Sequence, residues 1–169
     1  IKALEILDTR DDISSIDVSI VSFGLAGNNA LRDRLQSISK LKVTNYDSID
    51  NSSMPELISR HNIFVSTSIE ETFGCSIVEA AMMGLEMVVT DCLSIRDFFT
   101  EQDAHIVPIM NPVAVAKAIE LVLNGERRNS ESLRERLVMS YGYDAFADKM
   151  RKIVENVINR HGNRCRKKG

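Results

Sequence analysis

The sequence has 169 residues, of which 44% are hydrophobic and 27% are charged, and its formal net charge at pH 7 is −3. This length is enough for one globular domain with a hydrophobic core. Because aromatic residues make up only 5%, with no Trp, and the net charge is negative, we expect no nucleic-acid partner.

Strand-like and helix-like patterns alternate along the chain. Apolar, β-branched runs predict five strands, at residues 16–23, 41–46, 63–68, 85–90 and 105–109. Helical spacing and start signals predict helices at 1–7, 30–38, 54–60, 94–101 and 112–124, one ending at Gly84, one near Leu133 and one over Phe146 to Ile158. This alternation predicts an α/β fold with a doubly wound, mostly parallel sheet.

We predict one domain at residues 1–160 and a basic tail at 161–169. The apolar stripe from Phe146 to Ile158 is expected to dock onto the core and end the fold. The tail is expected to be solvated and disordered, with contact to a membrane of anionic lipid as an alternative. Because the chain begins on a helix, we expect a first strand upstream of Ile1.

The cysteines indicate the compartment. Cys75, Cys92 and Cys165 form no C-x-x-C pair, which favours a reducing environment and argues against structural zinc. We expect a cytoplasmic protein, with membrane association left open. The sequence contains no run of 18 apolar residues and no secretory signal. Ile1 is not a natural start residue, so we expect the chain to be a fragment.

Residues 63–84 carry the most informative pattern, which predicts a strand, an acidic turn and a helix. Glu71 falls in the turn and Glu79 about one turn into the helix. The first amides of a helix attract phosphate, and ionised carboxylates accept hydrogen bonds from sugar hydroxyls. The spacing alone favours a different interpretation, in which Ser76-x-x-Glu79 is a capping box.

The full string is more specific than the spacing. Glu71-Thr-Phe-Gly-Cys-Ser-Ile-Val-Glu79-Ala-Ala-Met-Met-Gly84 closely resembles the E-x7-E motif of retaining glycosyltransferases with the GT-B fold. The nearest resemblance is to the family 4 group of nucleotide-sugar-dependent transferases. Val88-Val89-Thr90-Asp91 resembles the strand that follows the motif there, and the resemblance extends to about Arg160.

The resemblance implies a C-terminal, Rossmann-like donor-binding domain at residues 1–160. Glu79 would hold the ribose of a nucleotide-diphosphate sugar, and Glu71 would be the catalytic residue beside the sugar in retaining hexosyl transfer. The donor-binding residues would be Phe73, Gly74, Cys75, Ser76 and Glu79. No metal and no cofactor are expected. A missing N-terminal domain would hold the acceptor, so the fragment alone is expected to be inactive.

The sequence departs from the family in three places. The Arg and Lys that clamp the diphosphate in relatives lie on the first strand and its loop, which we expect upstream of Ile1. The acceptor-side histidine of relatives would lie in the missing N-terminal half. Leu93-Ser94-Ile95-Arg96-Asp97 stands where relatives often have Gly-Gly-x-Pro-Glu, and Glu86 replaces a proline, a loop change that we expect to have no chemical consequence. A non-catalytic sugar-nucleotide-binding module therefore stays open, as does another GT-B enzyme such as an epimerase or phosphorylase.

Two further features have structural interpretations. Gly24-Leu25-Ala26-Gly27 lacks the G-x-G-x-x-G spacing of a dinucleotide site, so a turn that ends a strand is favoured over a site-lining loop. His61, His105 and His161 have no metal-ligand spacing, and we expect each to be structural or exposed.

Overall fold

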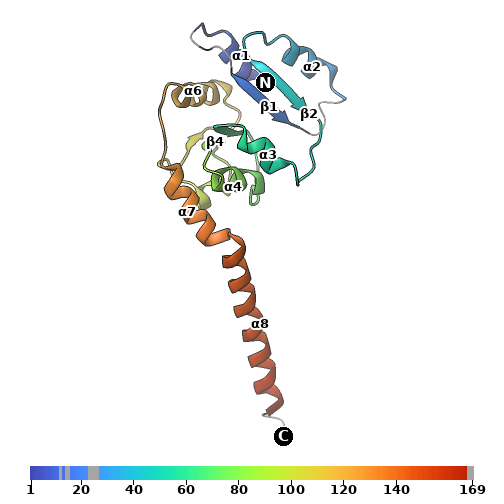
Figure 1. Ribbon diagram of the computed structural model, residues 1–169, viewed down its shortest axis with the longest axis vertical. Helices are drawn as coiled ribbons and strands as arrows, with labels where there is room; N and C mark the ends of the chain where they lie inside the picture. Colours follow the sequence, from blue (N-terminus) through green and yellow to red (C-terminus); the bar gives the residue numbers. More distant parts are fainter. Residues whose placement is uncertain (12, 14–15, 23–26, 167–169) are drawn as a thin grey trace.

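The chain is described by a computed structural model (Figure 1), which covers residues 1–11, 13, 16–22 and 27–166 and gives side chains as far as residue 159. The strands are β1 (Asp17–Val21), β2 (Lys42–Tyr46), β3 (Ile63–Ser66), β4 (Glu86–Thr90) and β5 (His105–Val107). The helices are α1 (Lys2–Asp8), α2 (Asn29–Gln36), α3 (Met54–Ser59), α4 (Cys75–Met82), α5 (Ile95–Phe98), α6 (Pro112–Leu123), α7 (Ser130–Tyr141) and α8 (Tyr143–Arg166).

Every strand pair in the described part of the chain is parallel, as predicted. β1 pairs with β2, and β3, β4 and β5 pair in that order, with Val65 opposite Val88 and Val88 opposite His105. The hydrogen bonding is interrupted between β1 and β3, so the five predicted strands form a two-stranded and a three-stranded sheet.

Strand β4 is the centre of the fold because all five of its residues are buried. Met87 and Val89 belong to one core cluster, which residues of α3, α4, α5 and α7 complete. Val88 points the other way, into a second cluster built with α1, α2 and α6. A strand whose successive side chains enter two cores must be covered by helices on both faces. This arrangement confirms the predicted doubly wound α/β class.

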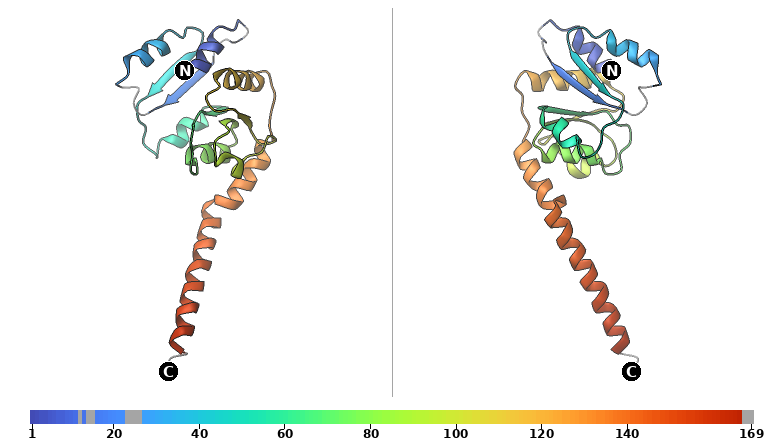
Figure 2. Two further views of the ribbon diagram at one scale, coloured as in Figure 1. Left: turned by 180° about the vertical axis from the view of Figure 1, so that it is seen from behind. Right: turned by 45° about the vertical axis from the view of Figure 1, so that its right-hand side comes forward.

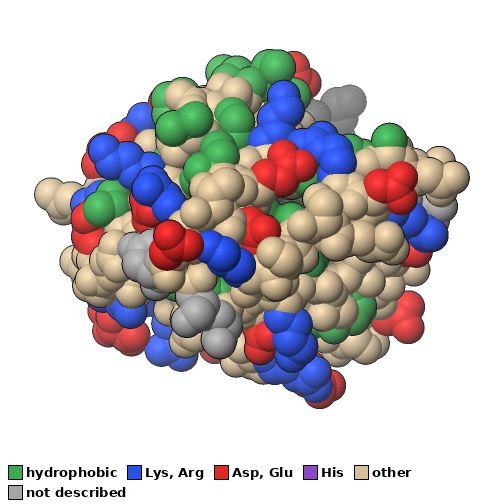
Figure 3. Space-filling view, turned by 90° about the horizontal axis from the view of Figure 1, so that it is seen from above, with side chains coloured by type: hydrophobic (Ala, Val, Ile, Leu, Met, Phe, Trp, Pro, Cys, Tyr) green, Lys and Arg blue, Asp and Glu red, His purple; other side chains and the backbone are tan. Residues whose placement is uncertain are grey.

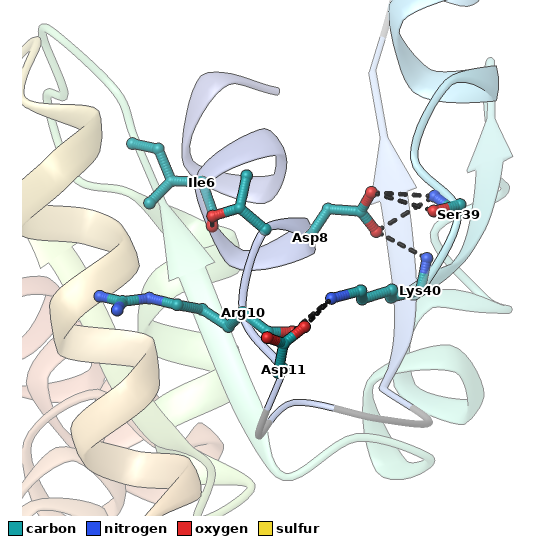
Figure 4. A network of polar contacts seen from close by, with 7 residues as sticks. Ile6, Asp8, Arg10, Asp11, Ser39 and Lys40 are labelled. Atoms are coloured by element: carbon teal, nitrogen blue, oxygen red, sulfur yellow. Dashed lines mark hydrogen bonds and ion pairs between the residues drawn. The ribbon is translucent and has the colours of Figure 1, made fainter.

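A polar network ties α1 to the turn before β2 (Figure 4). The Asp8 carboxylate accepts hydrogen bonds from the backbone amides of Ser39 at 3.1 Å and Lys40 at 2.6 Å, and these donors lower its pKa. The Lys40 ammonium in turn lies 2.8 Å from Asp11. These contacts fix the end of α1 beside β2 and so close the outer part of the second core.

Glu86 does not lie in a loop, as the sequence suggested, and it has a structural role. It is the first residue of β4 and only 8% exposed, and its carboxylate accepts a hydrogen bond from the Arg128 amide at 3.1 Å. The Arg127 guanidinium lies 3.9 Å from the same carboxylate. A buried carboxylate is tolerated because these groups supply partners, so Glu86 anchors the segment between α6 and α7.

The prediction that the last helix docks onto the core is wrong. α8 continues the line of α7 and projects away from the body in every view (Figures 1 and 2), and it stays helical to Arg166. Gly142 sits at the junction, where an added Cβ would lie 2.4 Å from the Val138 carbonyl oxygen. The stripe that begins at Phe146 therefore remains solvent-exposed on α8.

The imidazole of His105 gives the fold a testable pH dependence. His105 is 4% exposed, its Nδ1 lies 3.3 Å from an Arg128 nitrogen, and burial together with that guanidinium lowers its pKa. An unfolded chain titrates its histidine near pH ~6.5. Below that pH, His105 binds a proton in the unfolded state but not in the folded state, until the pH approaches the lower folded pKa. The free energy of unfolding should therefore have its highest value above about pH 6.5. It should fall as the pH drops toward the folded pKa, by at most about 1.4 kcal/mol per pH unit.

Urea unfolding at about pH 7.5 and about pH 5.5 measures this loss. The matched variant is His105→Gln, which cannot titrate in this range. We expect the variant to be less stable than the wild type at neutral pH but to lose less stability on acidification. Equal losses in the two proteins would show that another group sets the pH dependence.

Candidate functional site

The connection from β3 to α4 places the two glutamates of the motif. β3 ends at Ser66, and α4 begins after Gly74, which has the left-handed backbone angles φ 66° and ψ 54°. Residues with a side chain rarely adopt this conformation, and a Cβ here would lie 3.0 Å from Ile77 Cδ1. Glycine is therefore required at the turn that sends the chain into α4.

The start of α4 is open to a ligand. Gly74 is its N-cap and provides no side-chain cap, and the first turn contains no acidic residue. The amides of Ile77 and Val78 donate to the Gly74 carbonyl, at 2.9 and 3.0 Å. The amides of Cys75 and Ser76 donate to no group in the part of the chain that the structure describes. Two unpaired amides at a positive helix end form a potential anion site.

The capping-box interpretation of Ser76 and Glu79 is wrong. Ser76 is the second residue of α4, not its N-cap, and Glu79 is the fifth. The Glu79 side chain is exposed and forms no hydrogen bond or ion pair with the described residues. Its carboxylate is thus available to accept hydrogen bonds from a ligand.

Two successive hydrogen bonds from serine hydroxyl groups orient the Glu71 carboxylate. Ser66 donates to Ser68 at 3.3 Å, and Ser68 donates to the Glu71 carboxylate at 3.0 Å. Thr90, at the end of β4, donates to the Ser68 carbonyl and so fixes the loop to the sheet. The neighbouring Cys92 thiol is buried, and its pKa is raised by that burial and by the Glu71 charge. Glu71 is therefore a positioned carboxylate beside an inert thiol.

These residues line one cleft, of about 670 Å³, between α3 and α4. Five residues of the motif line the cleft: Glu71, Gly74, Cys75, Ser76 and Glu79. Its volume suits a small organic ligand. None of its lining residues is basic.

The sequence did not reveal the opposite wall of the cleft. Asn51, Met54, Pro55 and Ile58 form it, from α3 and the turn before it. Met54 and Pro55 belong to the helix-start signature that the sequence does contain. That signature predicts where α3 begins but not that α3 faces α4, which is decided by tertiary packing.

Phe73 is the one predicted donor-binding residue outside the cleft lining. Its ring packs edge-on against Phe98 and Tyr141, with ring centroids 5.1 and 5.5 Å away. Tyr141 is also the last residue of α7, and the Lys149 ammonium lies 5.5 Å from its ring centroid. The Phe73 side chain thus holds the motif loop against α5 and α7 and does not line the cleft.

Other candidate features lie elsewhere. Of Gly24-Leu25-Ala26-Gly27, only Gly27 falls within the described residues. Arg96 forms two 2.8 Å contacts with the Asp91 carboxylate and one with Glu101, which raise the Arg96 pKa and occupy its guanidinium. His61 Nε2 lies 2.9 Å from the Ser19 hydroxyl.

The described residues contain neither a cluster of metal-ligating side chains nor a membrane-spanning helix. They contain no group of three or more His, Cys, Asp or Glu side chains that could hold a metal ion. None of the described helices combines the length and the apolar composition that crossing a membrane requires.

Comparison with known proteins identifies the fold and the family. The model of the family "Glycosyl transferases group 1" matches residues 1–125. No curated protein sequence matches the chain. Among solved structures, sucrose-phosphate synthase from Thermosynechococcus elongatus aligns over 94% of this chain and 49% of its own, with a TM-score of 0.70 and 18% identity.

Two further solved structures give similar values. A glycosyltransferase from Rickettsia africae covers 93% of this chain and 43% of its own, with a TM-score of 0.71 and 19% identity. The pneumococcal O-GlcNAc transferase GtfA, in complex with UDP and GlcNAc, covers 93% of this chain and 32% of its own, with a TM-score of 0.69 and 16% identity. The chain therefore spans less than half the length of these proteins, and the likeness shows a GT-B, Rossmann-like domain.

The aromatic packing of Phe73 predicts a measurable loss of stability. Aromatic pairs contribute about 0.5–1.5 kcal/mol each beyond buried area, and Phe73 forms two of them. We expect Phe73→Leu to lower the free energy of unfolding by about 1–2 kcal/mol. The melting temperature should fall by a few degrees. Phe146→Leu is the matched control, because Phe146 is 59% exposed on α8. Equal effects of the two substitutions would show that the Phe73 cluster stabilises nothing.

Proposed function

The chain belongs to the glycosyl transferases of group 1, and from this premise we propose that the cleft between α3 and α4 binds a nucleotide-diphosphate sugar. The protein would use this donor for retaining transfer of a hexosyl group. The proposal rests on one observation: Glu71, Glu79 and the uncapped start of α4 line the same cleft.

The order of these groups along the chain matches the order of groups in the donor. The free amides of Cys75 and Ser76 lie between the two glutamates in sequence. They suit the negatively charged diphosphate, which is the central part of the ligand. The glutamates on either side suit hydroxyl groups, because an ionised carboxylate only accepts hydrogen bonds. Glu79 would take the ribose and Glu71 the sugar.

Glu71 is the better candidate for a role in transfer. Its carboxylate is fixed by Ser68, and the Ser68 carbonyl is held from β4 by Thr90. A preorganised charge stabilises a developing positive charge more effectively than a mobile one. We assign Glu71 to positioning and stabilising the sugar during transfer.

The diphosphate needs more positive charge than this cleft supplies. Its lining holds two glutamates and no Lys or Arg. We therefore propose that basic groups on a first strand and loop upstream of Ile1 complete the diphosphate site, and that a second domain holds the acceptor. Holding two substrates in the right orientation can lower the activation free energy by about 7–11 kcal/mol. Without the domain that holds the acceptor, this chain alone should therefore transfer no sugar.

The same lack of basic residues favours one alternative. A non-catalytic module could bind a sugar nucleotide through the amides and Glu79 without turnover. An epimerase with this fold is a further alternative, and turnover assays on the full-length protein distinguish these cases.

Nucleotide binding should be weak and independent of divalent metal. We expect UDP, GDP or ADP to bind with a Kd of about 1 mM, because amides alone neutralise the diphosphate. Calorimetric titration with and without EDTA measures this, and the free nucleoside is the control that lacks phosphate. A Kd that improves only when Mg²⁺ or Mn²⁺ is added would contradict the metal-independent mechanism.

Substitutions of Glu79 and Glu71 should have different effects, the first on nucleotide binding and the second on turnover. A hydrogen bond to a charged group contributes roughly 1.5–3 kcal/mol, so Glu79→Ala should weaken nucleotide binding by about ten- to a hundredfold. Glu71→Gln should leave nucleotide affinity unchanged and lower kcat and kcat/KM together in the full-length protein.

The control is Glu135→Ala, which removes an exposed carboxylate from α7. Since Glu79 caps no helix, its loss should change the free energy of unfolding by less than about 0.5 kcal/mol. If Glu79→Ala binds nucleotide as well as Glu135→Ala does, Glu79 has no part in the site.

A further inference from the structure

Helix α7 contacts α4 at both of its ends. In the first half of α7, the Arg134 guanidinium donates a hydrogen bond to the carbonyl of Met82, the last residue of α4, at 2.9 Å. Tyr141, the last residue of α7, packs its ring against Phe73, which directly precedes the N-cap of α4. The two helices therefore run antiparallel, and α7 holds the end of α4 as well as the loop that leads into it.

Three aromatic rings from three separate elements form one cluster at the motif loop, residues 67–74. They are Phe73 from the loop itself, Phe98 from α5 and Tyr141 from α7. Each ring packs against the other two, with centroid distances of 5.1, 5.5 and 5.5 Å. Aromatic rings attract one another most strongly in edge-on or offset arrangements, so the two helical rings fix the orientation of the third.

The helices that carry these two rings are themselves held by the core. Leu133 and Leu137 of α7 are 0% and 2% exposed in the core cluster that includes β4 residues. The Arg136 guanidinium, also on α7, donates to the Phe98 carbonyl at 3.0 Å and to the buried Asp103 carboxylate at 2.8 Å. Because packed interiors have little room to shift, the rings that meet the motif loop are fixed relative to the sheet.

Glu71 lies between two anchors of the motif loop. On its upstream side, the Ser68 carbonyl is held by Thr90, and the Ser68 hydroxyl donates to the Glu71 carboxylate. On its downstream side, the next anchor is the Phe73 ring. None of residues 69–72 is buried, and their backbones form no hydrogen bond with backbone groups of the described residues. The carboxylate therefore keeps its place only while both anchors hold.

We propose that Tyr141 is a positioning residue for Glu71 and acts through the Phe73 ring; this inference rests on the proposed function of the cleft. Tyr141 does not line the cleft, so it affects the sugar end of the donor only by fixing the loop that carries Glu71. The groups assigned to the nucleotide are held separately, because α4 buries Ile77 and Val78 in the core. Removing the Tyr141 ring should therefore impair transfer and spare nucleotide binding.

Backbone NMR relaxation of this chain tests whether the ring fixes the loop. Tyr141→Leu removes the ring, and we expect the order parameters of the Glu71 and Thr72 amides to fall from about 0.85 to below about 0.6. Tyr141→Phe keeps the ring and should preserve the wild-type values. The Glu79 amide, which lies inside α4, should keep an order parameter of about 0.85 in both variants.

The matched control is Val122→Ala, which lowers stability without touching the aromatic cluster. Val122 is 2% exposed in the second core, at the end of the body that α1, α2 and α6 form. Figure 3 views this end, over which basic and acidic side chains are interspersed, and α7 lies at the opposite end of the body (Figures 1 and 2). A lower order parameter at Glu71 in this variant would therefore reflect a general loss of stability.

Turnover by the full-length protein tests whether the position of the loop matters for transfer. Tyr141→Leu should lower kcat and kcat/KM together by at least about tenfold, because small misplacements of a reacting group are costly. The Kd for UDP, GDP or ADP should stay unchanged. Added to Glu71→Gln, Tyr141→Leu should cause no further loss, because two changes that act through one group are not additive.

The outcomes separate this proposal from the proposed function. Unchanged order parameters at Glu71 in Tyr141→Leu, an equal decrease in Val122→Ala, or independent losses of turnover in the double variant overturn the positioning role. If the order parameters change as expected but the wild-type protein turns over no sugar nucleotide, Tyr141 still fixes Glu71 and it is the proposed function that fails.

Discussion

The left-handed turn at Gly74 is the constraint on which the candidate site depends. It changes the direction of the chain between β3 and α4, and it places the first residues of α4, Cys75 and Ser76, in the lining of the cleft. Ile77, which lies closest to the missing Cβ, is 1% exposed and belongs to the core that packs on β4. A side chain at position 74 would therefore disturb the ligand side and the core side of α4 together. Site geometry and core packing are coupled through one turn.

The second fixed point is the carboxyl end of β4. Because β4 is buried on both faces, Thr90 is held in place by two cores, and it in turn holds the Ser68 carbonyl. Ser68 then orients Glu71. A rigid sheet thus determines the position of a carboxylate that lies on a loop, as expected for a functional group supported by regular structure.

The sequence predicts the structure of short segments but not the contacts between segments that are far apart in the chain. The strand, turn and helix around Glu71 and Glu79 follow from spacing within 22 residues, so their placement in one cleft could be anticipated. The α3 wall could not, because a helix-start signal at Met54 says nothing about its neighbour. The periodicity of the stripe around Ile153 correctly predicts an apolar helix face, but periodicity does not identify what covers that face. The interruption between β1 and β3 was missed because strand pairing depends on contacts between distant segments.

The distribution of charge limits how the cleft could hold a diphosphate. A diphosphate donor would enter a cleft lined by two carboxylates, and residues 1–142, which form the body, carry a net charge of −8. Short-range donation from the amides of Cys75 and Ser76 can act there, because hydrogen bonds depend on contact and not on the long-range field. No basic residue of α8 lines the cleft, and the helix projects away from the body. Under the proposed function, the positive charge that a diphosphate requires must therefore come from groups that do not line this cleft.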